Sequence, residues 1–387
     1  MHPIRTLSVT LTATALVVVV SAAPVTPAAA AAPPPAGTGR LIALGSLGGG
    51  QSWAERMNAR GDLIGGTTDA ADTWHAAVWW HGRSAPTALG VDRASPTAIN
   101  DRGHIAGQLW DGGLFLWRRG AVTRQSSPAG TSLEAVAVNN RDQVVGTAYD
   151  QDGATRAFLW QRGQLTMLST PAAADSSAVG INNHGQIVGV VTPRETAAEQ
   201  AVLWQRGRLT GLGTLGGPAS TPVAINDRGQ VAGNSTVQGS AADHPFRWQR
   251  GRMTDLLAGT TATSGRAYAL SGTGLVAGSA SGSTGESRPV LWRAGRMTDV
   301  GLPGHVGLAT AVNDRGDVAG PTWADPQGLA VPFRRQDGRT TLFPEPTGDI
   351  AIRVVGIDQH GTIAVALETT SSGLTLLRSA PKGEPVR

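Results

Sequence analysis

The sequence contains no cysteine, and its single lysine among 387 residues is Lys382. Without cysteine there can be neither a disulfide bond nor a thiolate metal site, so packing and hydrogen bonds must hold the fold together. Nearly all positive charge is arginine, and the formal net charge is only +4. The chain lacks the runs of lysine or arginine that follow a phosphate backbone. We therefore expect no nucleic-acid partner.

Charged and aromatic residues are also scarce, at 16% and 5% of the chain, and tryptophan (11) outnumbers phenylalanine (5) and tyrosine (2). Glycine (52) and proline (23) are abundant instead. This composition favours turns and disfavours long helices, which is typical of all-β proteins built from many short strands.

Residues 1–32 have the form of a secretory signal peptide. Arg5 precedes an apolar run at 7–20, and small residues follow it. The run is shorter than the roughly 20 apolar residues that a membrane span needs. We expect cleavage between residues 23 and 32, no membrane span after cleavage, a secreted extracellular protein, and a flexible leader at 33–39.

A unit of about 43 residues is repeated through the rest of the chain. Each unit contains four runs of strand length, and those of the fifth unit are 221–226, 230–235, 244–249 and 252–256. Four short strands in a repeat of this size are typical of one blade of a β-propeller. The turn between the first two strands begins at eight positions: Asn58, Asn100, Asn139, Asn182, Asn226, Ser271, Asn313 and Asp358.

The phase of the repeats predicts a closed ring. Residues 40–45 match 208–213, so the array begins with a fourth strand that no first three strands precede. The last unit ends after a third strand at 374–378. Pairing of these two ends would remove the exposed sheet edges of an open array. We predict one all-β domain at 40–379, an eight-bladed β-propeller followed by a tail at 380–387; a seven-bladed ring is the alternative.

The repeated residues are explained by the scaffold. The turn asparagine can bind its own backbone two residues on, and a glycine often follows at the position that needs positive φ. A tryptophan ends the third strand of most units, where we predict that it packs between blades: Trp80, Trp117, Trp160, Trp204, Trp248 and Trp292, with Arg335 in its place in the seventh unit.

Candidate ligand-binding residues lie where the units differ, because variable loops on a rigid scaffold commonly carry binding residues. Aromatic residues outside the repeated position fall in units 7, 1, 2 and 3, an arc around a closed ring: Trp53, Trp74, Trp110, Tyr149 and Trp323. The alternative is that each covers the edge of its own blade. A second candidate set is charged and lies five residues before the turn residue: Glu134, Arg266 and Arg353. Charges at a solvated channel mouth do not require a ligand.

Repeated runs of the form IN-[DN]-x-G-[QHD]-[IV]-[VA]-G, together with AF/VLW-Q-R-G and LT-x-LG-x-LGG, resemble the bacterial HAF-repeat family of extracellular repeat proteins. The tripeptide that names the family survives in part, as His75-Ala76, Ala157-Phe158 and His244-Pro245-Phe246. The resemblance covers the chain after the leader. It implies secretion and a repeat fold, and it carries over no activity and no catalytic residues.

Signals of catalysis are weak. The eight histidines have no metal-ligand spacing, and nucleophile, phosphate-binding and zinc-protease motifs are absent from the sequence. We therefore expect no metal and no cofactor, and a monomer that binds an extracellular glycan, cell-envelope material or another protein. One alternative is a polysaccharide hydrolase or lyase using two carboxylates such as Glu55 and Glu134. The other is a protein-interaction scaffold that uses the arginines of the repeated turns.

Overall fold

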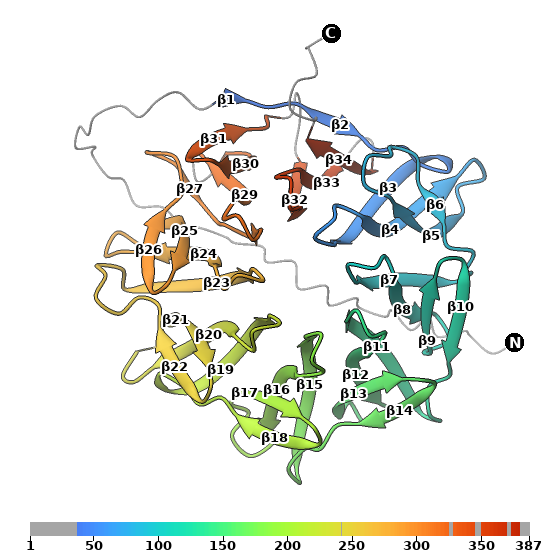
Figure 1. The fold of residues 1–387 in the computed structure, drawn as a ribbon, viewed down its shortest axis with the longest axis horizontal. Helices are drawn as coiled ribbons and strands as arrows, with labels where there is room; N and C mark the ends of the chain where they lie inside the picture. Colours follow the sequence, from blue (N-terminus) through green and yellow to red (C-terminus); the bar gives the residue numbers. More distant parts are fainter. Residues whose placement is uncertain (1–36, 241, 325–327, 345–349, 370–372, 380–387) are drawn as a thin grey trace, which may run out of the picture.

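The computed structural model describes residues 37–240, 242–324, 328–344, 350–369 and 373–379. The predicted signal peptide and the predicted tail at 380–387 lie outside these residues. Within them the chain has no helix, and hence none long and apolar enough to cross a membrane. The strands form eight sheets around a central axis (Figure 1). The predicted eight-bladed propeller is confirmed, and the seven-bladed alternative is wrong.

Six blades are four-stranded antiparallel meanders, each formed by four consecutive strands, with the first strand nearest the axis (Figure 1). The first blade contains β3 (Gly48–Met57), β4 (Leu63–Asp69), β5 (Trp74–Trp79) and β6 (Thr87–Ala88). The second contains β7 (Ala94–Ile99), β8 (Ile105–Leu109), β9 (Leu114–Arg118) and β10 (Ala121–Gln125). The third contains β11 (Thr131–Val138), β12 (Val144–Asp150), β13 (Thr155–Gln161) and β14 (Gln164–Met167).

The next three blades repeat this order. The fourth contains β15 (Ala174–Ile181), β16 (Ile187–Pro193), β17 (Gln200–Gln205) and β18 (Arg208–Gly211). The fifth contains β19 (Gly216–Ile225), β20 (Val231–Val237), β21 (Asp243–Gln249) and β22 (Arg252–Asp255). The sixth contains β23 (Ser264–Leu270), β24 (Val276–Ser281), β25 (Ser287–Arg293) and β26 (Arg296–Asp299).

The last two blades differ from the others. In the seventh, the first strand is divided into β27 (Val306–Gly307) and β28 (Ala311–Val312), and β29 (Val318–Trp323), β30 (Val331–Gln336) and β31 (Arg339–Leu342) follow. The eighth contains β32 (Ile350–Ile357), β33 (Ile363–Thr369), β34 (Gly373–Ser379) and, as its outermost strand, β2 (Leu41–Ala43).

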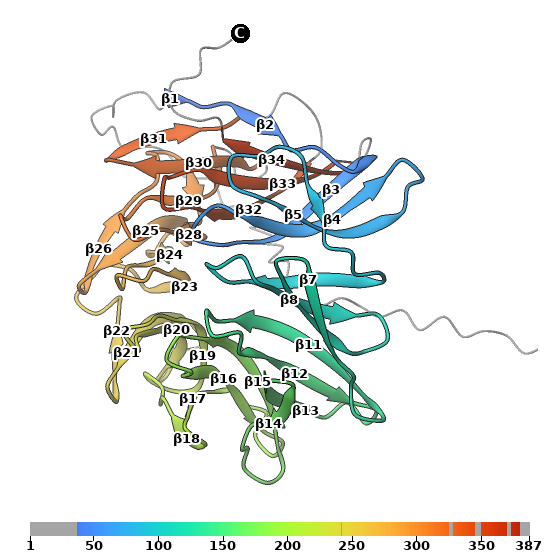
Figure 2. The same cartoon turned by 45° about the vertical axis from the view of Figure 1, so that its right-hand side comes forward.

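The ring closes as the repeat phase predicts. β2 pairs antiparallel with β34, with Ile42 opposite Arg378, so the two ends of the array share one blade. Figure 2 shows β2 at the outer edge of that blade. β1 (Gly37–Thr38) lies in the segment expected to be a leader, and it adds a parallel strand to β31 at the outer edge of the seventh blade.

The tryptophans pack between blades as predicted, with one correction. Trp204 is buried in a cluster with Val145 and Ala157 of the third blade, and its indole Nε1 donates to the Ser169 carbonyl (2.7 Å). In the first blade this place belongs to Trp79, whereas Trp80 is half-buried and packs against Trp117 of the second blade. Trp79 pairs with the first residue of β4, as Trp204 does with the first residue of β16, and its Nε1 donates to the Gly45 carbonyl (2.9 Å).

The turn asparagines join neighbouring blades. Each Oδ1 accepts hydrogen bonds from the backbone N–H groups two and four residues further along the chain, and the first of these two bonds was predicted. Each Nδ2 donates a hydrogen bond to the backbone carbonyl of the corresponding residue in the next blade. We call this ring of bonds the asparagine belt. Its six junctions, with N–O distances of 2.8 to 3.0 Å, are Asn58 to Asn100, Asn100 to Asn139, Asn139 to Asn182, Asn182 to Asn226, Asn226 to Ser271 and Asn313 to Asp358.

The meander places the turns on two faces. Connections between the first and second strands and between the third and fourth strands lie on the same face, because successive strands run in opposite directions. This face carries the asparagine belt and two-residue hairpins such as Arg162-Gly163, whose φ angles of 52° and 77° are those of a type I′ turn. We call it the constant face. The opposite face, with connections of varied length and sequence, is the variable face.

Candidate functional site

The three charged candidates and Trp53 occupy equivalent positions in their blades, as the repeat count predicts. Each of these residues in a first strand pairs with the fourth residue of the neighbouring second strand: Trp53 with Gly66, Glu134 with Thr147, Arg266 with Ser279 and Arg353 with Ala366. They therefore lie at one height in the first, third, sixth and eighth blades. The structure brings two of them into contact.

Trp53 and Arg353 meet at the seam between the first and eighth blades. The guanidinium of Arg353 lies over the indole ring of Trp53, 4.5 Å from its centroid, and its Nη2 is 3.5 Å from the Glu55 carboxylate. The indole Nε1 of Trp53 donates to the same carboxylate at 3.0 Å. Burial, opposed by the charge of Glu55, lowers the pKa of Arg353. Trp53 is half-buried, and the cation, the ring and the carboxylate contact one another, although Nε of Arg353 is buried without a hydrogen-bond partner.

The most exposed aromatic candidates lie on corresponding hairpins of three consecutive blades. Trp110 and Tyr149 each stand ten residues after the turn asparagine, at the end of the second strand, and Trp74 pairs with Thr68, the residue at that position in the first blade. Their exposed fractions are 60% for Trp110, 42% for Trp74 and 36% for Tyr149. Trp323 occupies the same position in the seventh blade, but it is half-buried and pairs with Val306.

The backbone of Trp110 is anchored by a hydrogen bond, whereas its indole ring is largely exposed to solvent. Its backbone N–H donates to the Arg93 carbonyl (2.8 Å), and the Arg93 guanidinium lies over the indole ring, 5.7 Å from the centroid. The tight turn that follows reaches the third blade, where the Leu133 N–H donates to the Gly112 carbonyl (2.8 Å). A glycine with φ of +89° makes this turn possible. The backbone thus fixes an exposed ring next to the first strand of the third blade.

Glu134 and Tyr149 form a hydrogen-bonded pair on that third blade. The Tyr149 hydroxyl donates to the Glu134 carboxylate, with an O–O distance of 2.7 Å. Burial and the neighbouring carboxylate together raise the pKa of Tyr149, so the hydroxyl stays protonated and keeps donating. We define the aromatic site as Trp74, Trp110, Arg93, Glu134 and Tyr149. It combines exposed rings, a cation and a carboxylate on the first three blades.

The remaining charged candidate lies apart from the aromatic site. Arg266 of the sixth blade forms an ion pair with Asp243 of the fifth, at 3.1 Å. The carboxylates of Glu55 and Glu134, the pair considered for glycoside cleavage, bind different partners. Glu55 is engaged by Trp53 and Arg353, whereas Glu134 binds Tyr149. The structure thus assigns the two carboxylates to different clusters on the first and third blades.

Sequence reasoning found the aromatic rings of this site but missed Arg93. Arg93 could not be recognised from the sequence, because only the fold of the second blade brings its guanidinium over the ring of Trp110.

The loss of the repeated tryptophan in the seventh blade was visible in the sequence. In the structure, Arg335 occupies that place and lines a cavity of about 350 Å³ between the sixth and seventh blades, together with Arg293 and Arg296.

No protein-family model and no curated protein matches this sequence. Its structure is similar to the β-propeller domain of the Trilobed protease from Pyrococcus furiosus, described as having an open velcro topology. The TM-score is 0.52 at 12% identity, over 77% of this chain and 100% of that chain. It is also similar to Porphyromonas gingivalis dipeptidyl peptidase 4, with a TM-score of 0.54 at 10% identity over 79% of this chain. The match spans 56% of that peptidase. Likeness at these identities shows the propeller fold alone.

Proposed function

We propose that this propeller is a secreted, non-catalytic binding protein whose aromatic site recognises an extracellular glycan of the cell envelope. The observation that carries the proposal is the placement of three exposed aromatic rings, Trp74, Trp110 and Tyr149, on corresponding hairpins of consecutive blades. Secretion is supported by the form of residues 1–32 and by the resemblance to extracellular HAF-repeat proteins.

The chemistry of the aromatic site suits a sugar. The apolar face of a pyranose ring stacks on an indole, and Trp110 offers a ring whose backbone is anchored on two sides. The Glu134 carboxylate accepts hydrogen bonds from hydroxyl groups, and the Arg93 guanidinium donates them. A pre-positioned ring and polar groups lower the entropic cost of binding. In the cluster of Trp53, Glu55 and Arg353 the ring is half-buried and both charged groups contact each other, so we assign the cluster to the seam rather than to the ligand.

The experiment is binding of the secreted chain to a glycan array and to cell-wall material. Trp110→Ala should weaken the binding that wild type shows by roughly thirtyfold, as expected for loss of about 2 kcal/mol from a central aromatic contact. Tyr149→Phe should have a smaller effect, because it removes the hydroxyl and keeps the ring. The matched control is Leu329→Ala, which removes another exposed apolar side chain, on the seventh blade.

Binding that is unchanged by Trp110→Ala together with Trp74→Ala would refute the site. Loss of binding in Leu329→Ala would also refute it, because the effect would then not belong to the first three blades. Release of reducing sugar from a polysaccharide, abolished by Glu134→Gln, would favour the hydrolase alternative over the binding protein.

A further inference from the structure

The asparagine belt changes its chemistry at the seam between the eighth and first blades. Asp358 stands at the turn position of the eighth blade, and its Oδ1 accepts from the N–H groups of His360 and Thr362 at 2.8 Å each, as an asparagine would. A carboxylate has no N–H to donate to the Asn58 carbonyl. Its Oδ2 is therefore left without a hydrogen-bond partner in a residue that is 0% exposed. A buried, unpartnered carboxylate oxygen requires an explanation.

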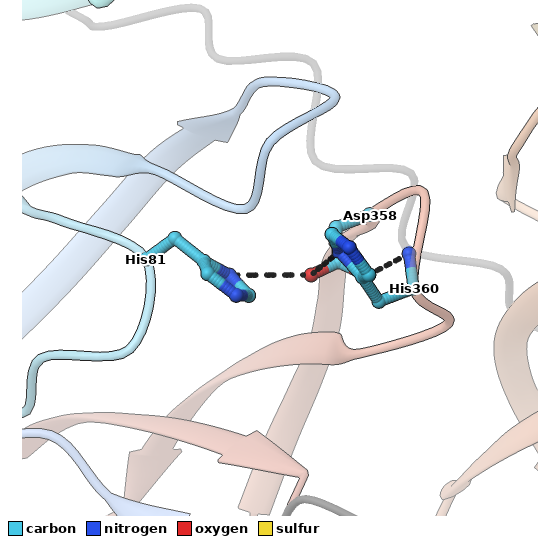
Figure 3. Close-up of side chains that lie close together, drawn as sticks. All are labelled: His81, Asp358 and His360. Atoms are coloured by element: carbon cyan, nitrogen blue, oxygen red, sulfur yellow. Dashed lines mark hydrogen bonds and ion pairs between the residues drawn. The ribbon is translucent and has the colours of Figure 1, made fainter.

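Two histidines face this oxygen (Figure 3). His81 comes from the turn between the third and fourth strands of the first blade, and its Nδ1 lies 3.4 Å from Oδ2 of Asp358. His360 comes from the belt turn of the eighth blade, with its Nδ1 at 3.9 Å. Their rings are stacked with centroids 5.4 Å apart. All three candidate ligand atoms lie within 4.8 Å of one another.

Gly61 leaves the space that brings these groups together across the seam. Its φ is +90°, and a Cβ at this position would lie 2.6 Å from Nδ1 of His81 and 2.8 Å from Oδ2 of Asp358. The turn that follows Asn58 therefore allows a side chain of the first blade to reach a carboxylate of the eighth.

We propose that His81, Asp358 and His360 bind a divalent transition-metal ion such as Zn²⁺, which fastens the first blade to the eighth. Two imidazole nitrogens and one carboxylate oxygen are a typical zinc ligand set, and tetrahedral bonds of about 2.0–2.2 Å place ligand atoms about 3.3 Å apart. The observed separations are 3.4 and 3.9 Å from Oδ2 and at most 4.8 Å between the two imidazole nitrogens, so the side chains would move closer together to bind the ion. Exposure of both imidazoles leaves the fourth position to water.

The metal would supply what the belt lacks at this junction. At six other junctions an amide N–H joins neighbouring blades, whereas here the ion would neutralise the unpartnered oxygen and join the eighth blade, which contains β2, to the first. Arg334 is the cation that would compete with a metal ion for the Asp358 carboxylate. Its Nη1 donates to the Gly361 carbonyl at 2.9 Å, and it does not bind Oδ2. Burial lowers the pKa of Arg334, while the charges of Asp317 and Asp358 act in the opposite direction.

The test uses the full chain without a histidine tag, stripped of metal with a chelator and titrated with Zn²⁺ by calorimetry and thermal unfolding. We expect one equivalent of Zn²⁺ to bind and the unfolding temperature to rise with it. His81→Gln and His360→Gln should each weaken Zn²⁺ binding by more than about tenfold, because loss of a direct ligand exceeds the effect of losing an outer partner.

Asp358→Asn separates the metal site from folding. The amide can donate to the Asn58 carbonyl as the other belt residues do, so the metal-free variant should be as stable as wild type or more stable, yet lose its response to Zn²⁺. The control is His184→Gln, at the position of His360 in the fourth blade, which should bind Zn²⁺ as wild type does. Failure of wild type to bind Zn²⁺ at one equivalent would overturn the proposal. So would unchanged affinity in His81→Gln and Asp358→Asn, or loss of affinity in His184→Gln.

Discussion

Asn182→Ala tests whether the asparagine belt holds the blades together. The side chain of Asn182 is buried and makes four hydrogen bonds. Its Oδ1 accepts from the N–H groups of His184 and Gln186 (3.0 Å each), and its Nδ2 donates to the Asn226 carbonyl (3.0 Å) and to Oε1 of Gln186 (2.7 Å). Alanine removes all four at once.

The expected loss follows from these contacts. A hydrogen bond contributes about 0.5–1.5 kcal/mol net, and a buried polar group left unpaired costs about 1–3 kcal/mol. The Asn226 carbonyl would keep the bond from the Gly229 N–H but lose its bond across the blade junction, while the two N–H groups of the turn can gain water in part. We therefore expect the free energy of unfolding to fall by about 3 kcal/mol, near the upper end for single substitutions.

Urea denaturation followed by tryptophan fluorescence measures this quantity, because the repeated tryptophans are buried between blades. Asn182→Asp should destabilise at least as much at neutral pH, since it keeps Oδ1 and puts an acceptor opposite the Asn226 carbonyl. His184→Ala is the control, because it alters an exposed side chain of the same turn. A change below about 0.5 kcal/mol in Asn182→Ala, the range of neutral surface substitutions, would show that the belt does not stabilise the ring.

Three further outcomes are expected. Trp204→Ala should lower the free energy of unfolding by about 3–5 kcal/mol in the same denaturation assay, because the indole is buried between blades. Arg335→Trp should raise it by about 0.5–2 kcal/mol by filling the cavity beside the seventh blade; destabilisation would mean that the cavity has been shaped around the arginine. The hydrogen bond from Arg194 lowers the pKa of Asp175, so its contribution to stability is present above the ordinary aspartate pKa and is lost as pH falls through the lowered value. Arg194→Gln should bring the Asp175 pKa back toward its ordinary range, as measured by NMR titration.

The repeat pattern was sufficient to predict the architecture. Turn residues at regular spacing gave the number of blades, and the unmatched strand at 40–45 gave the closure, because both depend on local patterns that the chain repeats. The assignment of the repeated position to Trp80 in place of Trp79 has a physical cause. Trp79 packs against the eighth blade and Trp80 against Trp117 of the second, and a pattern of period two does not say which of two adjacent tryptophans holds the repeated position.

The contacts that join different blades were not predictable in this way. The hydrogen bonds of Asn182 within its own turn follow from turn chemistry. Its hydrogen bond to the Asn226 carbonyl crosses to another repeat and does not follow from it. His81 and His360 lie near opposite ends of the repeat array and meet only because the ring closes. Spacing rules for metal ligands assume proximity in sequence, which explains why the histidines gave no signal.

The candidate site, like the contacts of Asn182, was predictable from the sequence only in part. Counting from the turn asparagine places Trp110 and Tyr149 at one position, so an aromatic arc can be recognised from sequence. Which rings remain open to a ligand depends on partners that the count does not reveal. Trp53 is covered by Arg353, and Glu134 is oriented by Tyr149. We therefore restrict the proposed arc to the exposed rings of the first three blades.

Departures from the repeat on the constant face concentrate around the seventh and eighth blades. The belt lacks its amide donor at Ser271, between the sixth and seventh blades, and at Asp358, between the eighth and first, whereas the bond from Asn313 joins the seventh blade to the eighth. At the first gap the N–H and hydroxyl of Thr273 bind Asp314, and at the second the Gln359 N–H binds the Ala59 carbonyl. The seventh blade also has the divided first strand and the cavity. Because each blade contacts mainly its neighbours, the two gaps in the belt set the seventh and eighth blades apart as the sector that the belt constrains least. A metal ion at Asp358 would strengthen one of these two junctions, the one between the eighth blade, in which the chain closes on itself, and the first.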